Sequence, residues 1–158
     1  MRKKNREVTD ISEIIDIMRK CDVCRICLNV ESGYPYIVPL NFGLHVDKDE
    51  ITLIFHGANE SHKLDLIAKD NRASFEMDCG HKLQYFEEKG YCTMSYESVM
   101  GRGHIRMYTG DEKMDALAKI MDQYYPGKNL YFNSDAAERT AIYALKVEEI
   151  TGKRKLPK

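Results

Sequence analysis

The sequence predicts a mainly β protein, a β-barrel of about six antiparallel strands with three or four helices at its periphery. Short segments in which apolar and polar residues alternate recur along the chain, as expected of half-buried strands. Few of the segments between them are helical and long enough to connect parallel strands. No G-x-G-x-x-G motif or P-loop follows a strand. We therefore do not expect the parallel sheet of a doubly wound nucleotide-binding fold.

Size and composition indicate one domain over residues 1–158, with flexible ends at 1–9 and 153–158. Lys and Arg number 24 and Asp and Glu 25, and this net charge of −1 argues against a protein that coats nucleic acid. No apolar run approaches the ~20 residues of a membrane-spanning helix, and no signal-peptide pattern follows the basic first residues. Five cysteines, an odd number, suit a reducing compartment. We expect a cytoplasmic protein without nucleic-acid or membrane partners.

The first third of the chain has the pattern of one helix and two strands. Asp10 is expected to cap the helix, with Glu13 three positions later as in a capping box. The apolar residues of this helix recur at i, i+3, i+4 and i+7: Ile11, Ile14, Ile15 and Met18. The period then changes to two, which predicts a strand at 23–29, a turn at 31–35 and a second strand at 36–45.

Pro39 lies inside this second strand. Because proline has no N–H group, its position indicates either an edge strand or a stretch whose backbone faces a ligand. A charged turn at 47–50 then leads to a third, strongly apolar strand at 51–55. A short helix at 61–70 follows, and the chain returns as an amphipathic strand at 72–78.

The second half begins with a polar, irregular segment at 79–90, which predicts a loop long enough to be functional. A long or bulged strand is predicted at 91–108, where two glycines permit a bend or a close approach of the backbone. A helix at 111–125 is stopped by a Pro-Gly pair. A less regular segment at 129–139 precedes the last predicted strand, at 141–151.

The polar segment between the third strand and the second helix is a candidate anion site. It brings a hydroxyl, two imidazoles and an ammonium group close to a helix start: Ser61, His56, His62 and Lys63. Backbone N–H groups at a helix start have no intrahelical partner and favour an anion. A phosphate monoester carries about −1.5 to −2 charges near neutral pH, so this set of groups suits it. The alternatives are a solvated helix lysine at Lys63 and a structural histidine at His56.

Three cysteines have the C-x2-C-x2-C spacing that begins some iron–sulfur sites: Cys21, Cys24 and Cys27. The next position of that pattern is Glu31 and not a cysteine, so buried, reduced thiols are the alternative interpretation. The histidines lack the short spacing of a zinc site. We therefore expect no metal.

Four motifs resemble the 5-nitroimidazole resistance proteins, which belong to the pyridoxamine 5′-phosphate oxidase-like flavin-binding split barrels. They are YPYIVPLNF at 34–42, IFHGA at 54–58, HKLDLI at 62–67 and SVMGRG at 98–103. The resemblance extends over residues 10–152. It implies a split β-barrel that forms a homodimer, with FMN, or possible FAD, bound in the clefts between subunits.

The resemblance also implies roles for fourteen residues, all in cofactor binding. The residues beneath the isoalloxazine ring would be Ile37, Val38, Pro39, Leu40 and Asn41. Those beside the ring and ribityl chain would be His56, Gly57 and Ala58, and those at the phosphate Ser61, His62 and Lys63. The residues that approach from a neighbouring strand would be Ser98, Val99 and Met100.

The function implied is that of a flavin-dependent oxidoreductase, a reductase of small planar electron acceptors such as nitroimidazoles. His56 would be its catalytic proton donor, since an unperturbed histidine pKa near ~6.5 suits proton transfer. The alternative is a non-enzymatic flavin- or haem-binding or redox-sensing protein on the same barrel. The chain has no tryptophan, and we find no counterpart of the C-terminal Trp and Arg elements of the vitamin-making oxidases. Pyridoxamine 5′-phosphate oxidase activity itself is therefore not expected.

Overall fold

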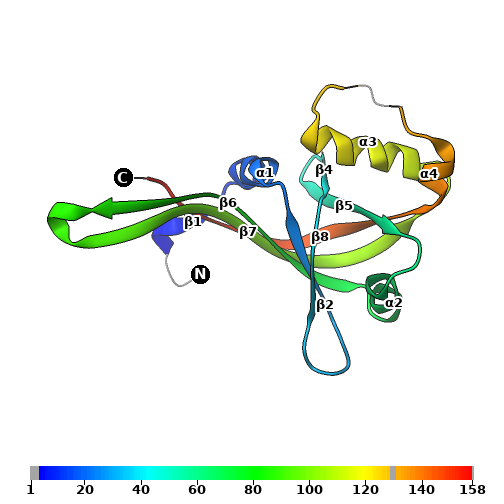
Figure 1. Cartoon of the computed structure of the whole chain (residues 1–158), viewed down its shortest axis with the longest axis horizontal. Coiled ribbons are helices and arrows are strands. Elements are labelled where there is room, and N and C mark those ends of the chain that lie inside the picture. The colour runs from blue at the N-terminus through cyan, green and yellow to red at the C-terminus, as the bar shows by residue number, and fades with distance from the viewer. Residues whose placement is uncertain (1–3, 129–130, 158) are drawn as a thin grey trace.

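The computed structural model describes residues 4–128 and 131–157, in which eight strands form one antiparallel sheet (Figure 1). Their order across the sheet is β3-β2-β6-β7-β8-β5-β4, and β1 pairs with β8. The strands are β1 (Glu7–Val8), β2 (Cys24–Leu28), β3 (Tyr36–Leu40), β4 (Gly43–Asp47), β5 (Glu50–Ala58), β6 (Arg72–Phe86), β7 (Tyr91–Tyr108) and β8 (Thr140–Lys155). The predicted mainly β, antiparallel split-barrel class is confirmed, although the sheet is not closed.

Within the same described ranges, four α-helices lie around this sheet (Figure 1). They are α1 (Ile11–Lys20), α2 (His62–Lys69), α3 (Glu112–Tyr124) and α4 (Ser134–Glu138), with single 3-10 turns at η1 (Lys4–Arg6) and η2 (Glu87–Lys89). Asp10 caps α1 as predicted, and its Oδ1 accepts a hydrogen bond from the Ser12 N–H at 2.8 Å. None of the described helices is long and apolar enough to cross a membrane.

The two edge strands of the sheet, β3 and β4, follow one another in the sequence. Only Asn41 and Phe42 separate them, so the chain passes from one edge of the sheet directly to the other. The sheet must therefore curl until its edges approach, which gives a barrel that is split between β3 and β4. The single strand predicted at 36–45 is wrong, because its two halves pair with different partners, β2 and β5.

Tyr124, at the end of α3, holds this two-residue link. Its hydroxyl donates a hydrogen bond to the Asp22 carbonyl at 2.8 Å and accepts one from the Phe42 N–H at 3.0 Å. The Asn41 side-chain amide also donates to it, at 3.2 Å. The phenyl ring of Phe42 is fully buried in the main core. One hydroxyl thus joins the last turn of α3 to the link between the two edge strands.

Two hydrophobic clusters lie on opposite faces of the sheet. The main core lies beneath α1 and α2 and includes the fully buried Ile17, Met18 and Phe55. The second cluster lies beneath α3 and comprises Ile54, Ala116, Ile120, Ile142 and Ala144. Because neighbouring residues of a strand point to opposite faces, Phe55 and Ile54 mark the two sides of β5.

Strands β6 and β7 extend as a two-stranded ribbon beyond the body of the molecule, at the left of Figure 1. The loop predicted at 79–90 is wrong: β6 continues to Phe86, with a register shift between Cys79 and Lys82. This pairing depends on backbone hydrogen bonds and leaves side chains of the ribbon in solvent, so it produces no apolar alternation in the sequence. Leu83 and Tyr85 on this ribbon are 61% and 67% exposed.

Strand β8 lies in the middle of the sheet, where it pairs with β7, β5 and β1. It continues to Lys155, and Glu7 and Val8 of β1 pair with Lys153 and Gly152. Residues 7–8 and 153–155, which the sequence assigned to flexible ends, are therefore strands. The long, bulged strand predicted at 91–108 is present as β7, with a register shift between Arg102 and Gly103.

Replacing Tyr124 by phenylalanine should lower the free energy of unfolding by about 1–3 kcal/mol, because three polar partners lose one hydroxyl. Equilibrium urea denaturation measures this change. Tyr125→Phe is the matched control, since the Tyr125 side chain is 58% exposed and the change should stay within about 0.5 kcal/mol. Equal effects of the two substitutions would show that the Tyr124 hydroxyl does not hold the link.

Candidate functional site

Ser61 is the N-cap residue of α2 and has extended backbone, with φ −167°. Its carbonyl accepts hydrogen bonds from the N–H groups of Leu64, at 2.9 Å, and Asp65, at 3.3 Å. Its side chain makes no cap bond, and its Oγ is buried without a hydrogen-bond partner among the described residues. Because an unpaired buried hydroxyl costs about 1–3 kcal/mol, the position is suited to a polar partner that the chain itself does not supply.

The ammonium of Lys63 lies over the backbone of Gly57, near the end of β5. A Cβ built on Gly57 would come within 3.1 Å of both Cε and Nζ of Lys63. A residue without a side chain therefore leaves the room that the lysine occupies. Within the described ranges, Lys63 makes no ion pair. Ser61 is thus the N-cap of α2 and Lys63 lies in its first turn, where N–H groups without an intrahelical partner favour an anion. The anion site itself stays a prediction.

His62 connects this helix start to β3. Its ring packs edge-on against the ring of Tyr36, with centroids 5.2 Å apart and planes at 88°. His62 also lines a hollow of about 500 Å³ between α2 and the chain that leaves β2. The first residue of β3 and the first residue of α2 are therefore neighbours, although they are far apart in the sequence.

His56 lies on the other side of β5 from this helix start. Adjacent strand residues point to opposite faces, so His56 shares the α3 face with Ile54, while Gly57 shares the face of Phe55. The exposed His56 pairs across the strands with Ile142 of the second cluster. The structure thus separates the His56 side chain from Lys63, which lies against Gly57.

The residues predicted on β3 divide between the two faces of the sheet. Val38 and Leu40 pack against the main core, and Ile37 and Pro39 alternate with them on the outer face. Ile37 is 61% exposed. Because β3 is the last strand at its end of the sheet, Pro39 lies in an edge strand, which is one of the two predicted alternatives. Asn41 instead belongs to the link held by Tyr124.

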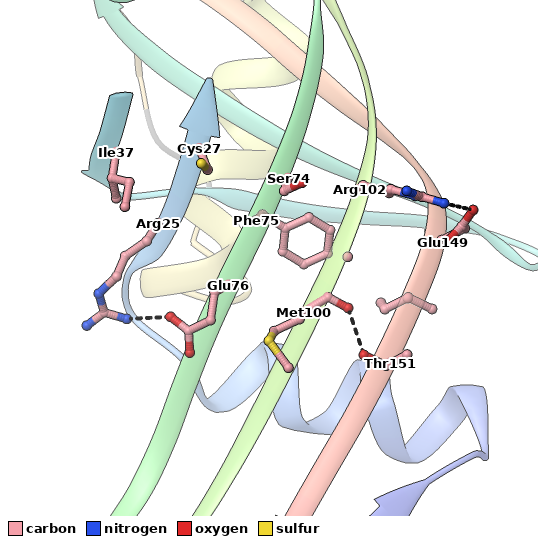
Figure 2. A pocket seen from close by; sticks show the side chains of 12 residues that line it. Arg25, Cys27, Ile37, Ser74, Phe75, Glu76, Met100, Arg102, Glu149 and Thr151 are labelled. Carbon is pink, nitrogen blue, oxygen red and sulfur yellow. Dashed lines mark hydrogen bonds and ion pairs between the residues drawn. The ribbon is translucent and has the colours of Figure 1, made fainter. Parts of the chain in front are cut away.

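A broad hollow of about 680 Å³ covers the outer face of β3, β2, β6, β7 and β8 (Figure 2). Two of the predicted site residues, Ile37 and Met100, line it. The strand register arranges its side chains in two rows across the sheet. One row is Pro39, Arg25, Glu76, Met100 and Thr151, and the other is Ile37, Cys27, Ser74, Arg102 and Glu149.

The charged groups of this hollow are paired with one another. Arg25 binds Glu76 at 3.2 Å and Asp78 at 2.6 Å, and the bond to Asp78 raises the pKa of the guanidinium. Arg102 binds Glu149 at 2.5 Å. Partial burial raises the pKa of the Glu76 carboxyl, and the charge of Asp78 adds to this shift. The hollow is therefore a mainly apolar surface of Met100, Cys27 and their neighbours, crossed by neutralised ion pairs.

The β7 residues of the predicted site also divide between faces. Val99 is fully buried in the main core, so its side chain is unavailable to a ligand. Ser98 and Met100 flank it on the outer face, and the Met100 carbonyl accepts a hydrogen bond from Thr151 Oγ1 at 3.4 Å. Neighbouring strands lie about 4.8 Å apart, so Met100 is separated from Pro39 by three strand spacings, roughly 14 Å.

The cysteines of the C-x2-C-x2-C segment do not come together as a cluster. Cys24 is buried in the core face of β2, while Cys27 lines the outer hollow. Burial raises the pKa of the Cys24 thiol to about 12. In the part of the chain that the structure describes, no group of three or more His, Cys, Asp or Glu side chains could hold a metal ion.

A family model described as pyridoxamine 5′-phosphate oxidase matches residues 10–154, nearly the whole sheet and its helices. The chain belongs to this family. The resemblance found in the four sequence motifs is thereby confirmed. None of the curated proteins matches the chain significantly.

Several solved structures of the family's split-barrel fold are similar to this chain. A candidate 5-nitroimidazole antibiotic resistance protein of Bacteroides thetaiotaomicron has a TM-score of 0.81 at 29% identity, over 94% of this chain and 86% of that one. An FAD- and haem-binding protein of Mycobacterium smegmatis has a TM-score of 0.80 at 19% identity, over 96% and 74%. The flavocytochrome Anf3 of Azotobacter vinelandii has a TM-score of 0.76 at 16% identity, over 99% and 72%.

The contacts of several residues at these surfaces had no signal in the sequence. Tyr36, Arg25 and Glu76 reach the candidate site only through strand pairing and helix packing, which no local pattern encodes. Tyr143 is a further case: its hydroxyl is buried without a partner among the described residues, and burial raises its pKa. The sequence signal for Tyr143 was its polar hydroxyl in an otherwise apolar strand.

Replacing Ser61 by alanine should raise the free energy of unfolding of the ligand-free protein by about 1 kcal/mol, because an unpaired buried hydroxyl is removed. Urea denaturation of protein stripped of bound small molecules measures this. Ser95→Ala is the control: its buried hydroxyl donates to the Lys82 carbonyl at 3.2 Å, so its loss should lower stability by about 1 kcal/mol. If Ser61→Ala is destabilising to the same degree, the Ser61 hydroxyl has a partner within the chain.

Proposed function

We propose that this protein binds a flavin nucleotide at the start of α2 and acts as a flavin-dependent oxidoreductase on small planar electron acceptors such as nitroimidazoles. The observation that carries the proposal is the buried Ser61 hydroxyl, unpaired among the described residues, at the start of the helix whose first turn also holds Lys63, with its ammonium over Gly57. These groups and the free N–H groups of α2 fit a flavin phosphate. The similarity to solved proteins described as FAD-binding, as haem-binding or as a flavocytochrome supports the same choice of ligand.

In this proposal the chain supplies binding and orientation, and the flavin supplies the redox chemistry. Lys63 and Ser61 hold the phosphate, and Gly57 gives the lysine room. His62 is fixed by its contact with Tyr36 and so directs the elbow, the polar segment at 55–63 that leads from β5 into α2, toward the exposed edge of β3. The backbone around Pro39 then offers an edge without a ladder partner on its outer side to the polar edge of a flat ring.

The proposal includes a homodimer with one flavin in each cleft between subunits. Met100 and Pro39 lie in one row on the outer face, separated by three strand spacings or roughly 14 Å. We propose that Met100 and Ser98 contact the flavin held by the second copy. The phosphate-binding groups of the elbow suit both FMN and FAD.

A second candidate is a flavin- or haem-binding protein without turnover. It is favoured by neighbours whose descriptions name binding alone, such as the FAD-binding and haem-binding proteins of Mycobacterium smegmatis. The position of His56 on the α3 face also favours it, since a proton donor must reach the acceptor bound at the flavin. If the second candidate binds flavin, it shares the phosphate site with the first, and the two differ in whether reduced flavin passes electrons to an acceptor.

Lys63→Ala should weaken flavin binding about 10- to 100-fold, because the loss of one charge-assisted contact to phosphate costs about 1.5–3 kcal/mol. Titration of FMN and FAD fluorescence with stripped protein measures the Kd. Lys69→Ala is the matched control, since Lys69 lies at the opposite end of the same helix and should leave the Kd unchanged. Wild-type protein that binds neither flavin would refute the proposed function outright.

His56→Ala should slow the reoxidation of bound, reduced flavin by a nitroimidazole about 100-fold if His56 donates the proton, with the flavin Kd unchanged. Anaerobic stopped-flow absorbance follows this reaction, and His45→Ala serves as the control. A wild-type rate in His56→Ala would remove His56 from the mechanism. Wild-type protein whose reduced flavin does not react with the acceptor would favour the second candidate.

A further inference from the structure

The ribbon that β6 and β7 form beyond the body of the molecule carries an apolar patch on one face (Figure 1). We call it the ribbon patch, and its members are Leu83, Tyr85, Cys92 and Met94, all of them exposed. The register pairs Leu83 with Met94 and Tyr85 with Cys92. Because directly paired residues of two strands point to the same face, the four side chains form one continuous surface.

The ribbon patch lies on the same face of the sheet as the broad hollow of Figure 2. Along β7 exposed residues alternate with more buried ones, and Cys92, Met94 and Met100 belong to the exposed set. Ser95 and Val99 alternate with them and are buried on the opposite side. Met100 lines the hollow, so patch and hollow are two apolar parts of one face.

The patch and the hollow cannot meet within one chain. Cys27, in the hollow, lies in the same row across the sheet as Arg102. Ten residues of β7 separate Arg102 from Cys92, which corresponds to roughly 33 Å. Because both surfaces belong to the same face of one continuous strand, β7 would have to break its pairing to fold one onto the other. A cover for either surface must therefore come from another molecule.

We propose that the ribbon patch packs in the outer hollow of a second copy of this chain, whose own ribbon patch packs in the hollow of the first. The inference rests on the homodimer of the proposed function and adds the surface that joins the two subunits. The two contacts are identical and reciprocal, so one two-fold axis relates the copies and the assembly closes at two.

The size of the apolar surface agrees with a dimer. Its large side chains are Leu83, Tyr85, Met94, Met100 and Ile37. Together they expose on the order of 500 Å², taking about 200 Å² for a large side chain. Apolar patches of about 300–600 Å² are often functional, and a stable interface buries about 800 Å² on each partner. The polar residues of the hollow supply the rest of that area when both contacts form.

The ribbon itself needs a covered face. A two-stranded ribbon alone is marginally stable in water, and a packed face makes it stable. The face opposite the patch has contacts within the ribbon: the Phe86 and Tyr91 rings stack with centroids 4.9 Å apart, and the Ser95 hydroxyl donates to the Lys82 carbonyl at 3.2 Å. The ribbon patch is exposed instead, so burial against a second copy would stabilise the ribbon.

The hollow has room for this contact beside the proposed flavin. It crosses the five strands β3, β2, β6, β7 and β8, which are four spacings or roughly 19 Å wide. A two-stranded ribbon covers about half of that width. The contact of Met100 with a flavin and the contact of the hollow with the partner's ribbon are therefore compatible.

Two thiols of the chain itself test the arrangement, because Cys92 belongs to the ribbon patch and Cys27 lines the hollow. The whole protein is treated with a short bismaleimide, digested and analysed by mass spectrometry. We expect a cross-link between Cys27 and Cys92 and a covalent dimer on a denaturing gel, since these thiols are too far apart within one chain. Cys92→Ser should abolish both. A cross-link of Cys92 to Cys92, or modification without a cross-link, would overturn the proposal.

Substitutions in the ribbon patch test its energetic role. Tyr85→Lys and Leu83→Lys should each raise the Kd of the dimer at least about 10-fold in sedimentation velocity, because each places a charge in an apolar contact. Tyr125→Lys is the matched control, since this exposed tyrosine follows α3 and lies outside the patch and the hollow. Circular dichroism checks that the variants are folded. Wild-type protein that is monomeric, or folded ribbon variants that dimerise like wild type, would overturn the proposal.

Titration of FMN fluorescence in the same samples reports on the proposed function separately. A dimer that gives the Cys27–Cys92 cross-link but binds no flavin would refute the flavin function and support the ribbon contact. Protein that binds flavin as a monomer would do the reverse.

Discussion

The two-residue link between β3 and β4 is the constraint on which the rest of the molecule depends. Consecutive strands that occupy opposite edges of one sheet force that sheet to curve, because the link through Asn41 and Phe42 lets the strand ends lie at most about 10 Å apart. Phe42 fills the resulting interior, and the hydroxyl of Tyr124 satisfies the backbone where the strand ladder is interrupted. The same curvature brings β3 beside the start of α2, so that Tyr36 meets His62. The candidate site therefore forms only when the sheet curls and β3 comes beside α2, and no single segment contains it.

At that site the chain keeps groups that its own fold does not satisfy. The Ser61 hydroxyl is buried and unpaired within the described residues, and the Lys63 ammonium lies over a glycine without an anionic partner. Such an arrangement lowers the stability of the ligand-free protein and is retained when a ligand offsets its cost. The outer hollow has the opposite character, since its arginines are already paired with carboxylates. Charge recognition thus belongs to the elbow, while the hollow offers an apolar surface.

The sequence was informative where structure is local. The cap at Asp10, helices α1, α2 and α3 and most strands follow from short-range patterns, whereas α4 lies in a segment that was expected to be less regular. The elbow was proposed as an anion site because a helix start and a polar cluster coincide in the chain. The sequence was uninformative where the partner of a strand decides the outcome. The break at Asn41, the strand pairing beyond Cys79 and the separation of Cys24 from Cys27 all depend on register, which is non-local. His56 illustrates the same limit, because adjacent residues at a strand end face opposite ways and a shared motif does not reveal this.

The central place of β8 has a consequence for how the protein is made. This strand pairs with β7, β5 and β1, yet it is the last strand to leave the ribosome. Until then one edge of β5 and one edge of β7 have no neighbour, and Ile54 and Phe55, both fully buried later, remain uncovered. During synthesis there is therefore a period in which two strand edges have unpaired backbone groups that can pair with other chains. Slow translation or early termination near position 140 would lengthen that exposure and increase the demand on chaperones.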